Sequence, residues 1–185
     1  VRKHLQSDLP IIEGGGSIGV VSCVMNRILV HPTDHVVIEA NPRLISILTK
    51  NRDQNHCKFE IINAALDQSG PEVTFYLHEK FVGGSAQRKT ETPVTVPTVT
   101  VKKILEKKGW KQVSLVIDIE GAEIDLIHQE KNVLRDHVAV IIVEMHPIIS
   151  GDEPIARALK ELESAGFVFQ ERQMDVYVYY NTHLS

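Results

Sequence analysis

The sequence predicts an α/β fold: a doubly wound (Rossmann-like), mostly parallel sheet that ends in an antiparallel hairpin. Apolar runs of strand length alternate with amphipathic helical stretches, which is the pattern of helices packed on both faces of a parallel sheet. The run Ala139–Glu144 is nearly continuous in Val and Ile, as expected of a strand buried on both faces. The last two strand candidates, Phe167–Glu171 and Asp175–Tyr180, are separated only by residues 172–174 and therefore predict a hairpin.

Size and composition indicate an ordinary globular protein. The 185 residues, 43% apolar and 24% charged, are expected to form one domain over residues 1–185. A net charge of −4 argues against a nucleic-acid partner. No apolar run is long enough to span a membrane, no signal-peptide pattern is visible, and Cys23 and Cys57 are isolated. We therefore expect a cytoplasmic protein with no membrane partner, of undetermined oligomeric state.

Local signals set the remaining elements. Thr100 as N-cap and Gly109 as terminator predict a helix over Val101–Lys108. Residues 81–97 lack apolar periodicity, and we interpret them as a mobile substrate loop, with a disordered surface excursion as the alternative. The other expected strands are Pro10–Glu13, Val36–Glu39, Phe59–Asn63, Val73–Leu77 and Ser114–Asp118. The other expected helices are Ser17–Val30, Pro42–Asn51, one ending near Leu134, and Pro154–Ala165.

The stretch Glu13–Gly19 predicts a ligand-binding turn. It reads E-G-G-G-S-I-G between an apolar strand and an amphipathic helix. Glycines let a backbone turn tightly and approach a ligand closely, while the N–H groups of the following helix point toward it. Glu39 ends the next strand, 20 residues beyond Gly19, where a carboxylate is placed to bind ribose hydroxyls. The alternative is that Glu39 helps to cap the next helix, where Asn41 and Pro42 have the character of N-cap and first helical residue.

Polar residues follow five of the predicted strands. Parallel sheets of this kind bind ligands beyond the carboxyl ends of their strands. We therefore expect the site at one rim, formed by Glu13, Glu39, Asn63, Asp118 and Glu144.

Four motifs give this chain a resemblance to the FkbM-type S-adenosylmethionine-dependent methyltransferases, over nearly all of residues 11–146. Glu13–Gly19 resembles the family's Asp-Val-Gly-Ala-Asn-Ile-Gly turn, and Glu39–Pro42 resembles Glu-Pro-Asn-Pro. Asp118–Glu123 (D-I-E-G-A-E) is close to Asp-Val-Glu-Gly-Ala-Glu, and Glu144–His146 resembles the acidic-apolar-His end of a later strand. The turn departs from the family in having Glu13 for Asp, Gly14 and Gly16 for bulkier residues, and Ser17 for Asn.

The resemblance implies the fold of class I methyltransferases, S-adenosylmethionine as cofactor, and methyl transfer mostly to the oxygen of a sugar or natural product. It implies that the turn Glu13–Gly19 holds the methionine end of the cofactor, that Glu39 takes the ribose hydroxyls, and that the segment Asn63–Ala65 lies against the adenine. The implied cofactor-binding residues are Glu13, Gly14, Gly15, Gly16, Ser17, Gly19, Glu39, Ala40, Asn41, Asn63, Ala64, Ala65, Asp118 and Glu120.

Methyl transfer to a hydroxyl requires in-line alignment and removal of the hydroxyl proton. His146 is the first choice for the base because its ordinary pKa is near neutrality, with Asp118 and Glu144 beside it at the rim; alternatively, His146 caps the loop before Pro147. Glu123, in the first turn of a helix, is expected to serve the helix dipole. No metal is required by the spacing, although Asp118, Glu120, Glu144 and His146 leave a divalent cation open.

Two other function classes remain open at this point. A nicotinamide-dependent oxidoreductase shares the glycine turn and the acidic second strand, but no catalytic Tyr/Lys pair stands out in the sequence. A cofactor-binding module without activity is the non-enzymatic alternative. The expected partner is a small-molecule or glycan hydroxyl acceptor.

Overall fold

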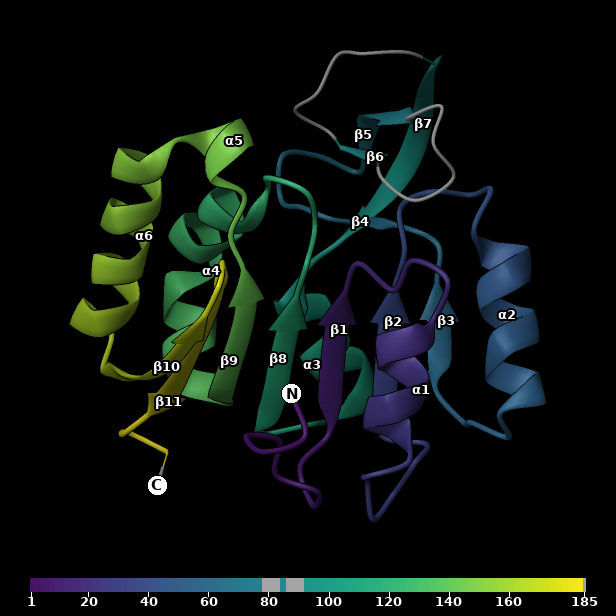
Figure 1. Ribbon diagram of the computed structural model, residues 1–185, viewed down its shortest axis with the longest axis horizontal. Coiled ribbons are helices and arrows are strands. Elements are labelled where there is room, and N and C mark those ends of the chain that lie inside the picture. The colour runs from purple at the N-terminus through teal and green to yellow at the C-terminus, as the bar shows by residue number, and fades with distance from the viewer. Residues whose placement is uncertain (78–83, 86–91, 185) are drawn as a thin grey trace.

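The protein, represented by a computed structural model, is built on a seven-stranded sheet with helices on both faces (Figure 1). The structure describes residues 1–77, 84–85 and 92–184. The strand order is β10-β11-β9-β8-β1-β2-β3, in which β11 alone runs antiparallel to both neighbours. The doubly wound parallel sheet with an antiparallel C-terminal hairpin, predicted from the sequence, is therefore confirmed. Within the described residues, no helix has the length and apolar character to cross a membrane.

The bounds of the sheet's strands lie close to those expected. They are β1 (Ile11–Gly14), β2 (His35–Ile38), β3 (Glu60–Ile62), β8 (Val113–Ile117), β9 (Val138–Glu144), β10 (Phe167–Gln173) and β11 (Val176–Asn181). The helices are α1 (Val20–Asn26), α2 (Ile45–Gln54), α3 (Val101–Lys108), α4 (Glu123–His137), α5 (Pro147–Ser150) and α6 (Asp152–Ser164).

Alternate residues of the central strands enter cores on opposite faces of the sheet. Ile12 and Leu115 pack with residues of α3, α4 and α6, whereas their neighbours Ile11 and Val116 pack with Met25 of α1 and with the N-terminal segment. Every residue of β8 is buried, because its side chains pack alternately into the cores on the two faces of the sheet. A strand in this position has no solvent-facing side, which explains the continuous apolar runs in the sequence.

Helix α3 forms where the sequence places it because both of its ends carry the expected signals. The Thr100 side chain accepts a hydrogen bond from the Lys103 N–H at 3.1 Å, and Gly109 ends the helix in the left-handed region at φ 68°. Helix α1 is shorter at both ends than the predicted Ser17–Val30: it begins later because Ser17 and Gly19 take left-handed conformations (φ 47° and 85°) that a helix excludes, and it ends at Asn26. Helix α2 likewise begins only at Ile45 rather than at Pro42.

A second, four-stranded sheet lies above the carboxyl ends of the main strands (Figure 1). It contains β4 (Ala65–Leu66), β5 (Glu72–Leu77), β6 (Gly84–Ser85) and β7 (Thr92–Val99), in the order β4-β7-β5-β6. The loop predicted for residues 81–97 is wrong over Thr92–Pro97, which belong to β7, and at Gly84–Ser85, which form β6; its other residues lie outside those described. Pro93 and Pro97 made this strand hard to recognise in the sequence. On the side of β7 that faces β4, only Thr98 and Val99 are paired, so the missing N–H of either proline breaks no hydrogen bond there.

Candidate functional site

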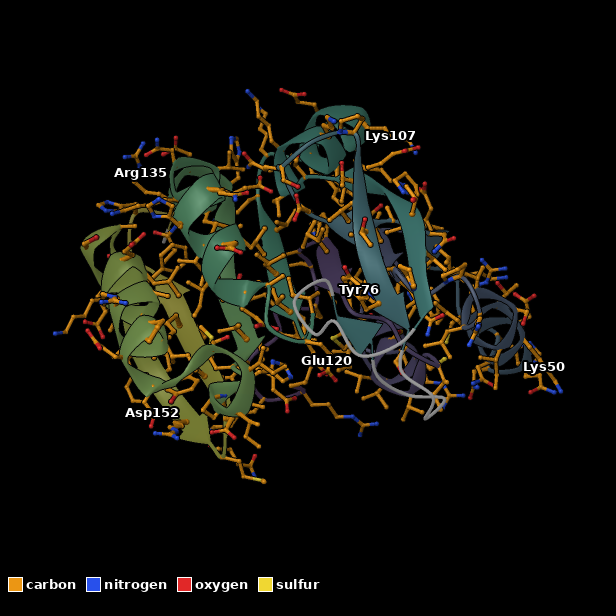
Figure 2. All side chains as sticks on the ribbon, turned by 90° about the horizontal axis from the view of Figure 1, so that it is seen from above. Lys50, Tyr76, Lys107, Glu120, Arg135 and Asp152 are labelled. Carbon is orange, nitrogen blue, oxygen red and sulfur yellow. The ribbon has the colours of Figure 1, made fainter. Side chains whose placement is uncertain are left out.

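One pocket lies at the carboxyl ends of the main strands, below the second sheet. It holds about 800 Å³ of empty space, including open solvent at its mouth. Nine of the predicted cofactor residues line it: Gly15, Ser17, Glu39, Ala40, Asn41, Ala64, Ala65, Asp118 and Glu120. Figure 2 looks down on this rim, and Glu120 lies near the middle of the view.

Glu39 forms part of the pocket wall through a buried carboxylate. One oxygen accepts the Ser17 N–H at 2.6 Å and the other accepts the Asn41 N–H at 2.7 Å. Burial raises the pKa of Glu39, against the lowering effect of these two hydrogen bonds. Each carboxylate oxygen can accept a second hydrogen bond, so Glu39 can fix the glycine turn and still bind ligand hydroxyls.

The glycine turn fits tightly against the end of β8. Gly15 has φ 88°, and a Cβ added there would lie 1.7 Å from the Asp118 carbonyl oxygen, so only glycine fits at this position. Ser17 and Glu120 are non-glycine residues in the left-handed region, at φ 47° and 55°, and both line the pocket. Such backbone strain is concentrated at functional sites.

Five predicted cofactor residues do not line the pocket: Glu13, Gly14, Gly16, Gly19 and Asn63. The three glycines pack closely: a Cβ at Gly16 would lie 2.3 Å from a Val37 methyl group, for example. Asn63 donates a hydrogen bond to the Glu39 carbonyl oxygen at 2.7 Å and thereby ties the ends of β2 and β3 together.

Glu13 is placed differently from the expectation of a direct cofactor contact. Its carboxylate is 3% exposed, accepts a hydrogen bond from Ser22 Oγ at 2.9 Å and lies 3.0 Å from His35 Nε2. Asn26 lies on the other side of the His35 ring, with 3.4 Å between the two nitrogens. Glu13 therefore belongs to a buried polar network beneath the turn.

The apolar lining includes residues that sequence reasoning missed, among them Leu44, Leu66 and Phe75. Phe75, on β5, is 7% exposed and packs with Ala65 and Val96. The alternation of Val73 and Phe75 in a predicted strand was a signal for an inward face, but nothing in the sequence placed that strand over the pocket. An apolar slot beside a buried carboxylate suits a nucleoside, because the base can lie on the apolar walls while the carboxylate accepts from ribose hydroxyls.

His146 lies beside the pocket among carboxylates and is not one of its lining residues. Its Nε2 is 3.4 Å from Asp118 Oδ1 and 3.9 Å from Glu120 Oε2, and its Nδ1 is 3.1 Å from Glu123 Oε1. Asp118 and then Glu123 raise the pKa of His146 to about 10, against the lowering effect of burial. The ring therefore holds a proton at neutral pH, and the base role predicted for it requires loss of that proton. His146 stands at the N-cap of α5, but its side chain makes no capping hydrogen bond.

Two further carboxylates complete this rim. Burial and then the charge of Asp118 raise the pKa of Glu144, at the end of β9. Glu123 opens α4 as expected of a helix-dipole residue, and its carboxylate also accepts hydrogen bonds from the N–H groups of Ile119 and Gly121 at 3.0 Å. The sequence did not reveal its contact with His146, because that contact joins the starts of two helices through the fold.

Comparison with known proteins identifies the family and the fold. The model of the methyltransferase FkbM domain matches residues 13–169, well over half of the chain, while comparison with curated proteins gives no match. Precorrin-6y C5,15-methyltransferase from Geobacter metallireducens GS-15 superposes with a TM-score of 0.58 at 13% identity, covering 98% of this chain and 84% of its own.

Two fibrillarins have the same fold. That of Aeropyrum pernix, solved with natively bound S-adenosylmethionine, gives a TM-score of 0.54 at 13% identity and covers 95% of this chain. Our chain spans 66% of that fibrillarin, just under two thirds of its length. The Methanococcus jannaschii fibrillarin, described as a pre-rRNA processing protein, gives 0.56 at 13% identity, with coverages of 95% and 67%. The chain belongs to the FkbM methyltransferase family and has the Rossmann-like fold of class I methyltransferases.

Proposed function

We propose that this protein transfers a methyl group from S-adenosylmethionine to a hydroxyl group of a small molecule or glycan. One observation carries the proposal: a single pocket joins the nucleoside-type lining around Glu39 to the carboxylates Asp118 and Glu120. The part of the pocket around Glu39, which we call the cofactor end, is therefore continuous with the part around Asp118 and Glu120, which we call the reactive end.

The residues at the cofactor end have distinct roles in this proposal. Glu39 accepts hydrogen bonds from the ribose hydroxyls with the acceptor positions left by its two backbone partners. Ala65 and Phe75 lie against the adenine. Gly15 and Ser17 border the methionine end, and Glu13 supports the turn from beneath rather than by contact.

The bound cofactor supplies an electrophilic methyl group on a sulfonium. At the reactive end, an acceptor oxygen must lie in line with the methyl carbon and sulfur, since the C–O bond forms as the C–S bond breaks. The hydroxyl proton must leave in the same step or next to it. Asp118 is our choice for the group that takes it, because Asp118 lines the pocket. His146, 3.4 Å from Asp118, holds that carboxylate in place, and Glu144 adds negative charge at the rim.

The charge at the rim supports a neutral acceptor over a nucleic acid. Asp118, Glu120 and Glu144 influence one another electrostatically around His146, and the chain carries a net charge of −4. Phosphate backbones are held by Lys and Arg, and carboxylates repel them. A sugar or polyol hydroxyl brings no charge that this rim would reject.

The test has a binding stage and a transfer stage. Calorimetric titration with S-adenosylmethionine, S-adenosylhomocysteine and NAD is expected to show micromolar binding of the first two only. Methyl-labelled cofactor is then offered with a panel of hydroxylated small molecules, oligosaccharides and, separately, an RNA pool. Label is expected in the small molecules or glycans, and Asp118→Asn is expected to lower the rate at least 100-fold with cofactor affinity nearly unchanged.

Other outcomes contradict the proposal at different points. Labelling of the RNA pool alone would reject the acceptor class and leave the cofactor site standing. Binding of NAD in place of S-adenosylmethionine would reject the cofactor as well. Tight cofactor binding with no transfer to any acceptor class would favour a binding module without activity.

A further inference from the structure

We propose that Asp118, Glu120 and His146 bind one divalent transition-metal ion, which holds the acceptor hydroxyl beside the cofactor. The binding of the ion depends only on these three side chains; its use in methyl transfer rests on the proposed function.

Geometry is the first support. The donor atoms of the three side chains all lie within 4.8 Å of one another, and His146 Nε2 is 3.4 and 3.9 Å from the two carboxylate oxygens. Metal–ligand bonds to nitrogen and carboxylate oxygen measure about 2.0–2.2 Å, so two ligands of one ion lie at most ~4.4 Å apart. Both distances from Nε2 fit within that limit. Within the described residues, no other group of His, Cys, Asp and Glu side chains meets the same criterion.

The balance of charge is the second support. One imidazole faces three carboxylates, those of Asp118, Glu120 and Glu123, at ion-pair distances, and Glu144 acts on the same group. Even with a proton on the ring, negative charge exceeds positive charge in this cluster. A divalent cation at Nε2 would lie against two of these carboxylates and reduce the excess.

The placement of the imidazole is the third support. Glu123 is fully buried and fixed by the N–H groups of Ile119 and Gly121, and its Oε1 lies 3.1 Å from His146 Nδ1. Nδ1 is buried and has no partner with hydrogen-bond geometry among the described residues, which calls for an explanation. A metal-binding histidine usually has a carboxylate beside its second ring nitrogen. Here Glu123 lies at ion-pair distance from Nδ1, and Nε2 is turned toward Asp118 and Glu120.

The donor set indicates the class of metal. Imidazole suits Zn²⁺, Fe²⁺ and similar ions, and carboxylates suit Mn²⁺ and Mg²⁺. A mixed set of one nitrogen and two carboxylate oxygens therefore favours Mn²⁺, Fe²⁺ or Zn²⁺ over Ca²⁺ or Mg²⁺. Such an ion acidifies a bound hydroxyl. In that form of the reaction the proton passes to solvent water, the C–O bond forms and the C–S bond breaks, while Asp118 serves as a ligand.

The experiment measures ion binding without cofactor or acceptor. Chelator-treated protein is titrated with MnCl₂, followed by the loss of the free-ion signal in electron paramagnetic resonance, and with ZnCl₂ and MgCl₂ by calorimetry. We expect one Mn²⁺ or Zn²⁺ per chain, bound at least tenfold more tightly than Mg²⁺. Asp118→Asn and His146→Ala should each weaken Mn²⁺ binding at least tenfold, with Glu120→Gln close behind.

His128→Ala is the matched control, because His128 Nδ1 also lies 3.3 Å from a carboxylate, that of Glu161, but in an exposed pair. It should bind Mn²⁺ as the wild type does. An equal effect of His128→Ala and His146→Ala, or no Mn²⁺ binding at millimolar concentration, would overturn the proposal. Thermal melting of each variant separates loss of the site from loss of the fold. Methyl transfer that is unaffected by chelators would reject the use of the ion and leave the proposed function intact. Mn²⁺ binding without methyl transfer would support the ion site and contradict the proposed function.

Discussion

Glu13 and Glu39 end neighbouring parallel strands, yet the fold uses them in opposite ways. Both carboxylates are buried, at 3% and 6% exposure. Glu13 is bonded to the side chains of Ser22 and His35 beneath the glycine turn. Among the residues that the structure describes, Glu39 is bonded to the backbone N–H groups of Ser17 and Asn41, and it borders the pocket. Each carboxylate has one partner on each oxygen and can accept further hydrogen bonds, but Glu39 borders the pocket and can offer them to a ligand, whereas Glu13 is enclosed beneath the turn.

Removal of Glu13 should give the largest effect on the fold. Glu13→Ala leaves Ser22 Oγ and the buried His35 ring without their partner, so we expect a loss of about 3 kcal/mol in the free energy of unfolding. Urea denaturation measures this loss, and Glu13→Gln should recover part of it. Cofactor affinity of the folded protein should change less than threefold. A stable Glu13→Ala protein that no longer binds cofactor would reverse the assignment of the two glutamates.

Removal of Glu39 should act mainly on binding. Glu39→Ala is expected to weaken S-adenosylhomocysteine binding about 30-fold, the equivalent of about 2 kcal/mol for hydrogen bonds to a charged group. The matched control is Glu130→Ala, because Glu130 is also a buried carboxylate that accepts two backbone N–H groups, those of Val101 and Lys102, and does not border the pocket. Calorimetry on both variants should show normal affinity in the control. Equal losses in the two would indicate a general effect of destabilisation.

The pH dependence of cofactor binding should follow Glu39. Burial raises its pKa above 4.5, so lowering the pH protonates it earlier than an ordinary glutamate and removes its acceptor strength. We expect affinity to fall as the pH is lowered from 7 toward 4, and Glu39→Gln to bind more weakly but equally at every pH in that range. The contribution of Glu39 to the free energy of unfolding should change with pH in the opposite direction. Because burial raises its pKa, the ionised form is costly in the folded protein, and this contribution declines as the pH rises through the folded-state pKa. Identical pH curves for wild type and Glu39→Gln would place the titrating group elsewhere.

The smallest effect is expected at a surface pair. Glu153 and Arg157 lie 2.9 Å apart on α6, with side chains 84% and 65% exposed. Solvent screens such pairs, so Glu153→Ala should leave both the melting temperature and cofactor affinity unchanged within error. A measurable loss in either quantity would show that the exposure of a carboxylate does not predict whether it contributes to stability or to cofactor binding in this protein.

Sequence alone predicted the parts of the fold that depend on local signals. Helix α3 was predicted to the residue because Thr100 and Gly109 act on the backbone next to them. The positions of the glycine turn, Glu39 and Asp118 at one rim followed from strand order and from the rule that parallel strands end on the same side.

What was missed depends on contacts between distant segments. Strand β7 was hidden by Pro93 and Pro97, whose tolerance depends on how far β4 extends beside it. The placement of Phe75 over the pocket and the contact of Glu123 with His146 depend on tertiary packing. The different roles of Glu13 and Glu39 depend on which side chains from other elements pack against each carboxylate. Spacing along the chain carries no such information.

The second sheet has a consequence for how relatives of this protein can diverge. The chain leaves the main sheet after β3 and returns at α3, and the two ends of the excursion are joined by the pairing of Ala65 with Thr98 and of Leu66 with Val99. This pairing holds the two ends of the excursion together, so the segment between them can change in length or sequence at little entropic cost to the main sheet. Ala64, Ala65, Leu66, Asp67 and Phe75 are the residues of the described excursion that line the pocket. The excursion can therefore differ between relatives over most of its length, but Ala65 and Phe75, which the proposed function places against the adenine, tie part of it to the cofactor.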